Sequence, residues 1–219
     1  MNTHTIETRT HGRYLVDQPE GDGPFPVLVG FHGYSEGAER MLEEMRRVRA
    51  DRPWLLVSIQ ALNRFYSKAS TVVAGWMTRE DRELAIDDNR AYVRSVVAAV
   101  RREYPVNDVL VYAGFSQGVA MAYRAAAFVA GDTIPAPRGV ILLAGDIPPD
   151  VAPRLREFPP LLIGRGTTDH WYTEPKAEVD LDTLRAADVN PEVHIFEGGH
   201  VWEDSFVVRA GSFLDSMAS

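Results

Sequence analysis

The sequence predicts an α/β fold with a mostly parallel central sheet and helices on both of its faces. Short apolar runs of strand length alternate with segments of helical period along the whole chain, and this alternation builds βαβ units. The apolar runs are nearly continuous, which is typical of strands covered on both faces. A chain of 219 residues has the size of one ordinary domain, so we expect a single domain over residues 1–219.

Six strands are expected to form the centre of this sheet. Each is rich in Val, Leu and Ile, and each is separated from the next by a segment rich in helix-forming residues. The predicted strands cover residues 25–31, 53–59, 108–115, 139–143, 160–164 and 191–196. Residues 14–16 predict one additional strand, which would lie antiparallel at the edge of the sheet.

Five helices are expected between and after these strands. They are rich in Ala, Leu, Glu and Arg, and the last one carries its large apolar side chains on one stripe. The predicted helices cover residues 38–50, 79–104, 117–130, 175–188 and 204–217. The segment 63–75 has no clear period, and we expect it to form a loop over a pocket.

Composition excludes several classes of protein. The 23 basic and 31 acidic residues give a net charge of −8, and an acidic surface repels the phosphates of nucleic acids. The chain has no polybasic segment and no apolar run near the ~20 residues of a membrane span, so we expect no stable membrane anchor. The absence of cysteine excludes thiolate nucleophiles and cysteine-bound zinc. Residues 1–23 are polar and lack a signal-peptide pattern, which favours a cytoplasmic protein.

The pattern Gly-x-Ser-x-Gly occurs twice, at residues 33–37 and 114–118. The second copy directly follows a predicted strand and leads without a break into an Ala-rich helix, as in the tight strand-to-helix turn that presents a nucleophilic serine. Ser116 would then lie at the helix N-terminus, where free N–H groups stabilise an oxyanion. Ser35 lies in a polar loop, where a turn or helix-cap role is the simpler interpretation. The sequence therefore favours Ser116 as the nucleophile.

A serine nucleophile needs a base within hydrogen-bond reach and an acid that orients the base. His200 follows the last predicted strand through a Gly-Gly turn, and Asp169 follows the strand before it, which gives the chain order Ser, Asp, His. Asp146 follows an earlier strand and is the alternative acid. His194 lies within a strand, and the side chain of His170 is expected to point away from that of its neighbour Asp169.

The loop after the first long strand begins Phe31-His32-Gly33-Tyr34. We expect the backbone N–H groups of Tyr34 and Gln117 to form the oxyanion hole, while His32 braces the loop from a buried position. The downstream acids and histidines lack the paired helical spacing of a zinc site. We therefore expect neither a metal nor a cofactor.

Together these motifs resemble the phospholipase/carboxylesterase family of α/β-hydrolases, which includes small carboxylesterases, lysophospholipases and acyl-protein thioesterases. Residues 114–118, Gly-Phe-Ser-Gln-Gly, match the family's typical elbow residue for residue. The resemblance implies the α/β-hydrolase fold and hydrolysis of small-molecule esters or thioesters through an acyl-enzyme. The segments 34–36 and 165–168 depart from the family pattern, and these departures bear on the substrate class.

Trp76, ahead of the long helix, is similar to a residue that lines the acyl pocket in this family. Met77, Trp171 and Tyr172 are further candidates for pocket walls. Two other functions stay open: a hydrolase-fold protein that binds a small ligand without turning it over, and an acyltransferase that uses the same three residues. The sequence also leaves the oligomeric state open, a homodimer included.

Overall fold

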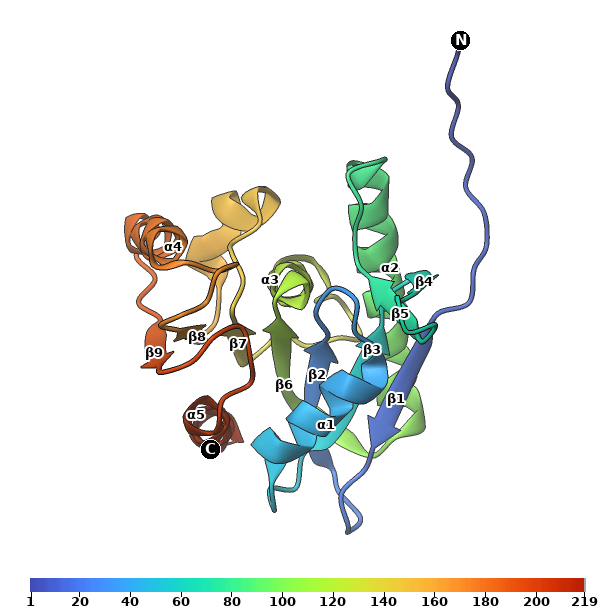
Figure 1. The fold of residues 1–219 in the computed structure, drawn as a ribbon. Coiled ribbons are helices and arrows are strands. Elements are labelled where there is room, and N and C mark those ends of the chain that lie inside the picture. Colours follow the sequence, from blue (N-terminus) through green and yellow to red (C-terminus); the bar gives the residue numbers. More distant parts are fainter. Residues whose placement is uncertain (219) are drawn as a thin grey trace.

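A seven-stranded sheet forms the centre of the computed structural model, which describes residues 1–218 (Figure 1). The strand order is β1-β3-β2-β6-β7-β8-β9, and all neighbours are parallel except β1 and β3. This confirms the predicted fold class and the antiparallel edge strand. The strands are β1 (Arg13–Asp17), β2 (Phe25–Phe31), β3 (Leu55–Gln60), β6 (Val106–Phe115), β7 (Gly139–Leu143), β8 (Leu161–Gly166) and β9 (Glu192–Phe196).

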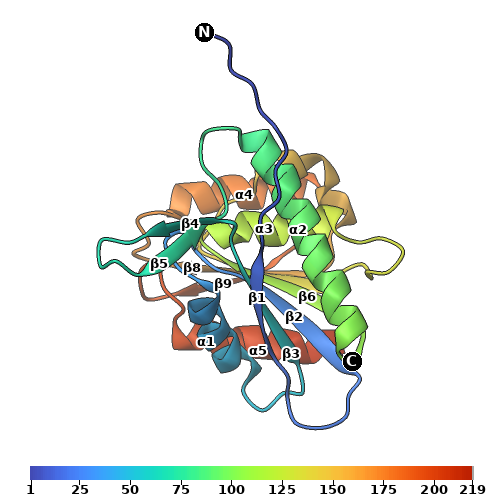
Figure 2. The ribbon, with the colours of Figure 1, turned by 90° about the vertical axis from the view of Figure 1, so that its right-hand side faces the viewer.

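Helices cover both faces of the sheet, which explains why β2 and β3 are buried at every position. Helices α1 and α5 lie on one face, and α2, α3 and α4 lie on the other (Figure 2). Their bounds are α1 (Ala38–Arg49), α2 (Arg82–Glu103), α3 (Gln117–Phe128), α4 (Glu174–Ala186) and α5 (Asp204–Ala218). Within residues 1–218, no helix is long and apolar enough to cross a membrane.

The predicted helices and central strands agree with the structure to within two residues at each end, with one exception. Helix α2 begins at Arg82, although the sequence predicts a start at residue 79. The backbone of Asp81 has φ 46° and ψ 41°, a left-handed conformation that an aspartate tolerates and a right-handed helix excludes. Residues 79–81 therefore belong to the segment that leads into α2.

Two further segments differ from their predictions. Residues 63–75, expected as a loop, form the hairpin β4 (Asn63–Tyr66) and β5 (Val72–Gly75), in which the aromatic and β-branched residues suit an exposed strand pair. The segment Pro149–Glu157 is a 3₁₀ helix that the sequence did not predict. Pro153 removes a backbone donor from the middle of this segment, which prevents a regular α-helix.

The end of β2 and the start of α3 approach each other unusually closely. A Cβ atom at Gly118 would lie 2.1 Å from the carbonyl oxygen of Phe31, and one at Gly114 would lie 2.4 Å from the carbonyl oxygen of Gly118. Real Cβ atoms essentially never come so near, so both positions require glycine. The two glycines thus set how tightly α3 packs across the carboxyl ends of β2 and β6.

We predict that Gly118→Ala destabilises the protein by roughly 1–3 kcal/mol or more, because the added methyl group overlaps backbone atoms that cannot move independently. The matched control is Gly131→Ala, since nothing lies within 4 Å of a Cβ at Gly131. Urea unfolding of both variants measures the difference. Equal unfolding midpoints for the two variants would show that the close approach is not a constraint.

Candidate active site

The carboxyl ends of β2 and β6 meet at the place where the strand order changes direction. From β2 the chain goes outward to β3 on one side; it later crosses back to β6 on the other side of β2 and continues outward to β7, β8 and β9. In open parallel sheets such a switch point leaves a crevice in which ligands bind. Ser116 lies at this point, between the end of β6 and the first residue of α3.

Ser116 has a strained backbone, with φ 53° and ψ −119°. Its N–H donates to the carbonyl of Leu143 at 2.9 Å, and its carbonyl accepts from the N–H of Val119 at 3.0 Å. A Cβ at Gly145 would lie 2.5 Å from the Ser116 carbonyl oxygen, so the end of β7 also packs directly against this turn. Such a conformation costs on the order of 1–3 kcal/mol and persists only where the surroundings fix it. The same turn directs the serine side chain outward.

Asp169 and His200 form a hydrogen-bonded pair. Oδ2 of Asp169 lies 2.8 Å from Nδ1 of His200, and Oδ1 accepts the N–H groups of Trp171 at 2.7 Å and Tyr172 at 2.9 Å. Burial by itself would raise the pKa of Asp169, but these hydrogen bonds outweigh it and hold the pKa below its usual value. Asp169 is therefore an ionised acceptor, which fixes the proton of His200 on Nδ1 and leaves Nε2 free to accept a proton.

The imidazole of His200 is also held from the side. The ring of Phe115, the elbow residue before Ser116, lies 4.9 Å from the His200 ring between centroids, and Trp202 packs behind Phe115 at 6.1 Å. The residue inside the elbow motif thus positions the histidine as well as the serine.

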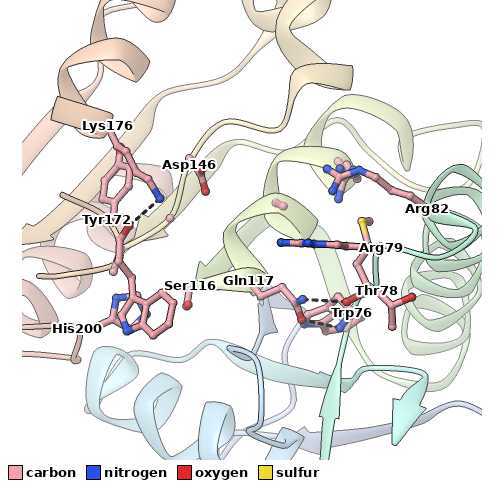
Figure 3. Close-up of a pocket in the computed structure, with 16 residues that line it drawn as sticks. Trp76, Thr78, Arg79, Arg82, Ser116, Gln117, Asp146, Tyr172, Lys176 and His200 are labelled. Atoms are coloured by element: carbon pink, nitrogen blue, oxygen red, sulfur yellow. Dashed lines mark hydrogen bonds between the residues drawn. The ribbon is translucent and has the colours of Figure 1, made fainter. Parts of the chain in front are cut away.

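Ser116 and His200 line the same cavity, which has a volume of about 400 Å³ (Figure 3). All four residues predicted as pocket walls also line it. Trp76 and Tyr172 are buried walls, whereas Trp171 is 73% exposed at the mouth. The full lining is Trp76, Met77, Thr78, Arg79, Arg82, Ser116, Gln117, Ala120, Arg124, Ala144, Gly145, Asp146, Trp171, Tyr172, Lys176 and His200.

The two residues predicted for the oxyanion hole come from neighbouring loops. Gln117 is the first residue of α3, where a backbone N–H has no partner inside the helix. Tyr34 belongs to the turn after β2, and the close approach at Gly118 brings this turn against the start of α3. The phenol ring of Tyr34 is not among the groups that line the cavity; it stacks on Phe65 at 5.3 Å. Only the backbone of Tyr34 is therefore relevant to the predicted role.

The side chain of Gln117 has a role that the sequence did not reveal. Its Oε1 accepts the N–H of Trp76 at 2.7 Å, and its Nε2 donates to the carbonyl of Met77 at 3.2 Å. The buried Asn89 of α2 donates to the Trp76 carbonyl at 2.7 Å. These bonds fix the segment after β5 as one wall of the cavity, beside the elbow (Figure 3).

His32 is buried and braces the loop after β2, as predicted. Its Nε2 accepts the N–H of Ala61 at 3.0 Å, so its Nδ1 carries the proton and donates to the carbonyl of Gly33 at 2.7 Å. Burial lowers the pKa of His32, which keeps the ring neutral. Its own carbonyl accepts the indole N–H of Trp76 at 2.9 Å.

The other candidates lie away from the nucleophile or make no contact with His200. Ser35 occupies a turn with φ 63° and lines a different groove, beside Glu36. His194 contacts Ser205, and His170 is exposed; neither lines the Ser116 cavity. Asp146, the alternative acid, lines the cavity, but the acid that contacts His200 is Asp169. Residues 1–218 contain no group of three or more acids and histidines that could hold a metal ion.

Four cations line the cavity, and none of them was predicted from the sequence. Arg124 is buried and pairs with the carboxylate of Asp150 through two bonds, at 3.0 and 2.8 Å. Lys176 donates to the carbonyl of Trp171 at 2.9 Å. Arg79 and Arg82 are exposed; Arg79 lies in the segment that leads into α2, and Arg82 is the first residue of α2. The only acid in the lining is Asp146.

Tyr172 is held in the cavity wall by a buried carboxylate. Its hydroxyl donates to Oδ2 of Asp180 at 3.0 Å, and the N–H of Ile147 donates to the same oxygen at 3.2 Å. Burial raises the pKa of Asp180 to about 6, and the two hydrogen bonds only partly offset this effect. The network ties α4 to the loop after β7.

The strand order and the strand-to-helix turn at Ser116 are those of the α/β-hydrolase fold. The sequence model of the FSH1 serine hydrolases matches residues 43–202, a span that contains all three residues. The chain therefore belongs to the FSH1 family of serine hydrolases. No curated protein sequence matches it.

Solved structures of similar fold include esterases and a thioesterase. The esterase PE8 is 21% identical with a TM-score of 0.69, and the alignment covers 94% of this chain and 98% of that one. The acyl-protein thioesterase 2 of Zea mays is 20% identical with a TM-score of 0.68, covering 95% and 100%. The carboxylesterase of Bacillus cereus is 17% identical with a TM-score of 0.71, covering 94% of each chain. The family and these folds confirm the resemblance that the motifs indicated.

We predict that Asp180 makes the free energy of unfolding depend on pH. A carboxyl group whose pKa rises from 3.8 to about 6 on folding binds more protons in the folded state, so its contribution to stability falls as the pH rises from about 4 to 6. The difference in unfolding free energy between Asp180→Asn and the wild type should grow in favour of the variant by up to about 3 kcal/mol between pH 4 and pH 7. Urea unfolding at several pH values measures it, and a constant difference would contradict the assignment.

Proposed function

We propose that this serine hydrolase cleaves carboxylic esters or thioesters of small molecules through an acyl-enzyme formed on Ser116. The observation that carries the proposal is the Asp169–His200 hydrogen bond at the edge of the cavity into which the strained Ser116 turn opens. A hydroxyl becomes a nucleophile only when an oriented base removes its proton, and this arrangement supplies such a base. The choice of esters and thioesters is supported by the similarity of the fold to esterases and a thioesterase.

In the proposed first step, Oγ of Ser116 attacks the carbonyl carbon while Nε2 of His200 takes the hydroxyl proton. The carbonyl π electrons move to the oxygen, and the N–H groups of Tyr34 and Gln117 stabilise this oxyanion; one such donor typically lowers a barrier by roughly 3–4 kcal/mol. The tetrahedral intermediate collapses, and His200 donates its proton to the departing alcohol or thiol. Asp169 keeps the imidazole in the required tautomer and stabilises its cation.

In the second step, water attacks the acyl-enzyme with the same assistance and releases the acid. Trp76, Met77, Trp171 and Tyr172 form the walls against which the acyl group and the leaving group pack. No metal or cofactor has a part in this sequence of steps. Transfer of the acyl group to an added alcohol instead of water would identify the acyltransferase alternative.

Several finer features stay predictions. They are a single domain over residues 1–219, a cytoplasmic location and the absence of a nucleic-acid partner. The oligomeric state stays open, and a homodimer is one of the options. A continuous sheet from β1 to β9 with one set of covering helices supports the single domain. The net charge of −8 supports the absence of a nucleic-acid partner.

Ser116→Ala should lower the turnover of p-nitrophenyl butyrate by roughly three to six orders of magnitude, because the attacking oxygen is removed. The same change should abolish labelling by a fluorophosphonate probe and leave the unfolding midpoint nearly unchanged. Ser35→Ala is the matched control and should retain both turnover and labelling, since Ser35 lies outside the cavity. Labelling that maps to Ser35, or equal losses in the two variants, would reject Ser116. A wild-type protein with neither turnover nor labelling from pH 6 to 9 would support the ligand-binding alternative.

Asp169→Asn should lower kcat by about 10³–10⁴-fold, because an amide at this position no longer fixes the proton of His200 on Nδ1. Asp146→Asn is the comparison, since Asp146 is the other acid in reach of the cavity. We expect its loss to be at least a hundredfold smaller than that of Asp169→Asn. The reverse order, measured with the same ester, would make Asp146 the acid of the triad.

A further inference from the structure

The cavity carries a positive charge that contrasts with the rest of the chain. The protein has a net charge of −8, yet the cavity lining contains Arg79, Arg82, Arg124 and Lys176 against Asp146 as the only acid. In a protein with 31 acidic and 23 basic residues, a cavity lined at random would contain more acids than bases.

The acids next to Arg79 and Arg82 in the chain are not part of the cavity lining. Glu80, Asp81 and Glu83 alternate with the two arginines along the chain, but none of the three lines the cavity. The backbone of Asp81, in the left-handed region before α2, contributes to this separation because it changes the direction of the chain between Arg79 and Arg82. The segment therefore presents its cations to the cavity and its acids elsewhere.

Arg124 is already neutralised, whereas Arg79 and Arg82 are not. Asp150 accepts both bonds from Arg124 and also pairs with Arg90 at 2.8 Å, so this carboxylate has no capacity left for a further cation. Within residues 1–218, neither Arg79 nor Arg82 forms an ion pair or a side-chain hydrogen bond. Two guanidinium groups thus point into the cavity with their donors available (Figure 3).

The position of these arginines indicates which part of a substrate they would contact. In Figure 3, His200 lies on one side of Ser116, and Arg79 and Arg82 lie on the other side, beyond Gln117. In the proposed reaction His200 protonates the leaving group, so the leaving group lies beside His200. The acyl group then extends in the opposite direction, toward Arg79 and Arg82.

We propose that the preferred substrates are esters whose acyl group ends in a carboxylate, bound by Arg79 and Arg82. This inference rests on the proposed function and specifies the substrate class of the same site. A guanidinium group matches a carboxylate through two parallel N–H···O bonds, and two such groups in a partly enclosed cavity favour an anion over a neutral acyl chain of the same length. Hydrolysis of such a half-ester releases a dicarboxylic acid and an alcohol.

The test compares two esters that differ in charge and little in shape, mono-p-nitrophenyl adipate and its methyl ester. We expect the wild type to hydrolyse the anionic ester with a kcat/KM at least tenfold higher than that of the neutral one, after subtraction of the spontaneous rates. The preference should fall as the salt concentration rises from 0.05 to 0.5 M, because salt screens exposed charges. Sodium adipate should inhibit the enzyme competitively.

Charge-removing variants assign the preference to the arginines. The double variant Arg79→Gln/Arg82→Gln should lower the anionic-to-neutral ratio of kcat/KM by about 10–100-fold, while Arg79→Lys/Arg82→Lys should restore much of it. Arg102→Gln, at the other end of α2, is the matched control and should leave the ratio unchanged. Fluorophosphonate labelling and the unfolding midpoint confirm that each variant is folded with an accessible Ser116.

The outcomes separate this inference from the function on which it rests. Hydrolysis of both esters at equal kcat/KM, with a ratio that the double variant does not change, overturns the carboxylate preference and leaves the esterase function in place. Failure to hydrolyse either ester, together with absent fluorophosphonate labelling, rejects the esterase function itself. A lower ratio in Arg102→Gln as large as that in the double variant would show a general effect of surface charge and overturn the assignment to Arg79 and Arg82.

Discussion

The site depends on backbone segments that pack closer than any side chain would allow. Gly114, Gly118 and Gly145 surround Ser116, and a methyl group on any of them would overlap the backbone of a neighbouring segment. This packing fixes the strained conformation of Ser116, the position of the turn after β2 and the direction of α3 together. The position of the serine is thus a property of how three strand ends meet at one point.

The cavity is lined mainly by cations, whereas the protein as a whole carries a net negative charge. Asp169 is buried, yet it stays ionised because three hydrogen-bond donors converge on its carboxylate. One of these donors is the imidazole of His200. Arg79 and Arg82 lie beyond the elbow, separated from this pair by Gln117. A net negative charge on the whole protein and a cationic cavity together favour small anions that enter the cavity over polyanions that require a broad basic surface.

Local patterns in the sequence predicted the features that depend on neighbouring residues. Apolar runs placed the strands, and the elbow motif with the Gly-Gly turn before His200 indicated which side chains would follow them. The hairpin of residues 63–75 was missed because each of its strands has only four residues and most of them are exposed, so no apolar alternation stands out. The 3₁₀ helix was missed because Pro153 breaks the helical pattern. The places of Arg79 and Arg82 in the cavity could not be predicted, since they depend on a left-handed residue, Asp81, and on the placement of α2.

The exposure of Trp171 gives the molecule an internal optical reporter. Three of the four tryptophans are buried, and the fourth stands at the mouth of the cavity, 73% exposed. Its indole emission is accordingly the one that water and soluble quenchers reach, so the red edge of the fluorescence spectrum reports on this single position. Occupancy of the cavity would shield this indole and shift the spectrum to shorter wavelength, without any dye or label attached to the chain.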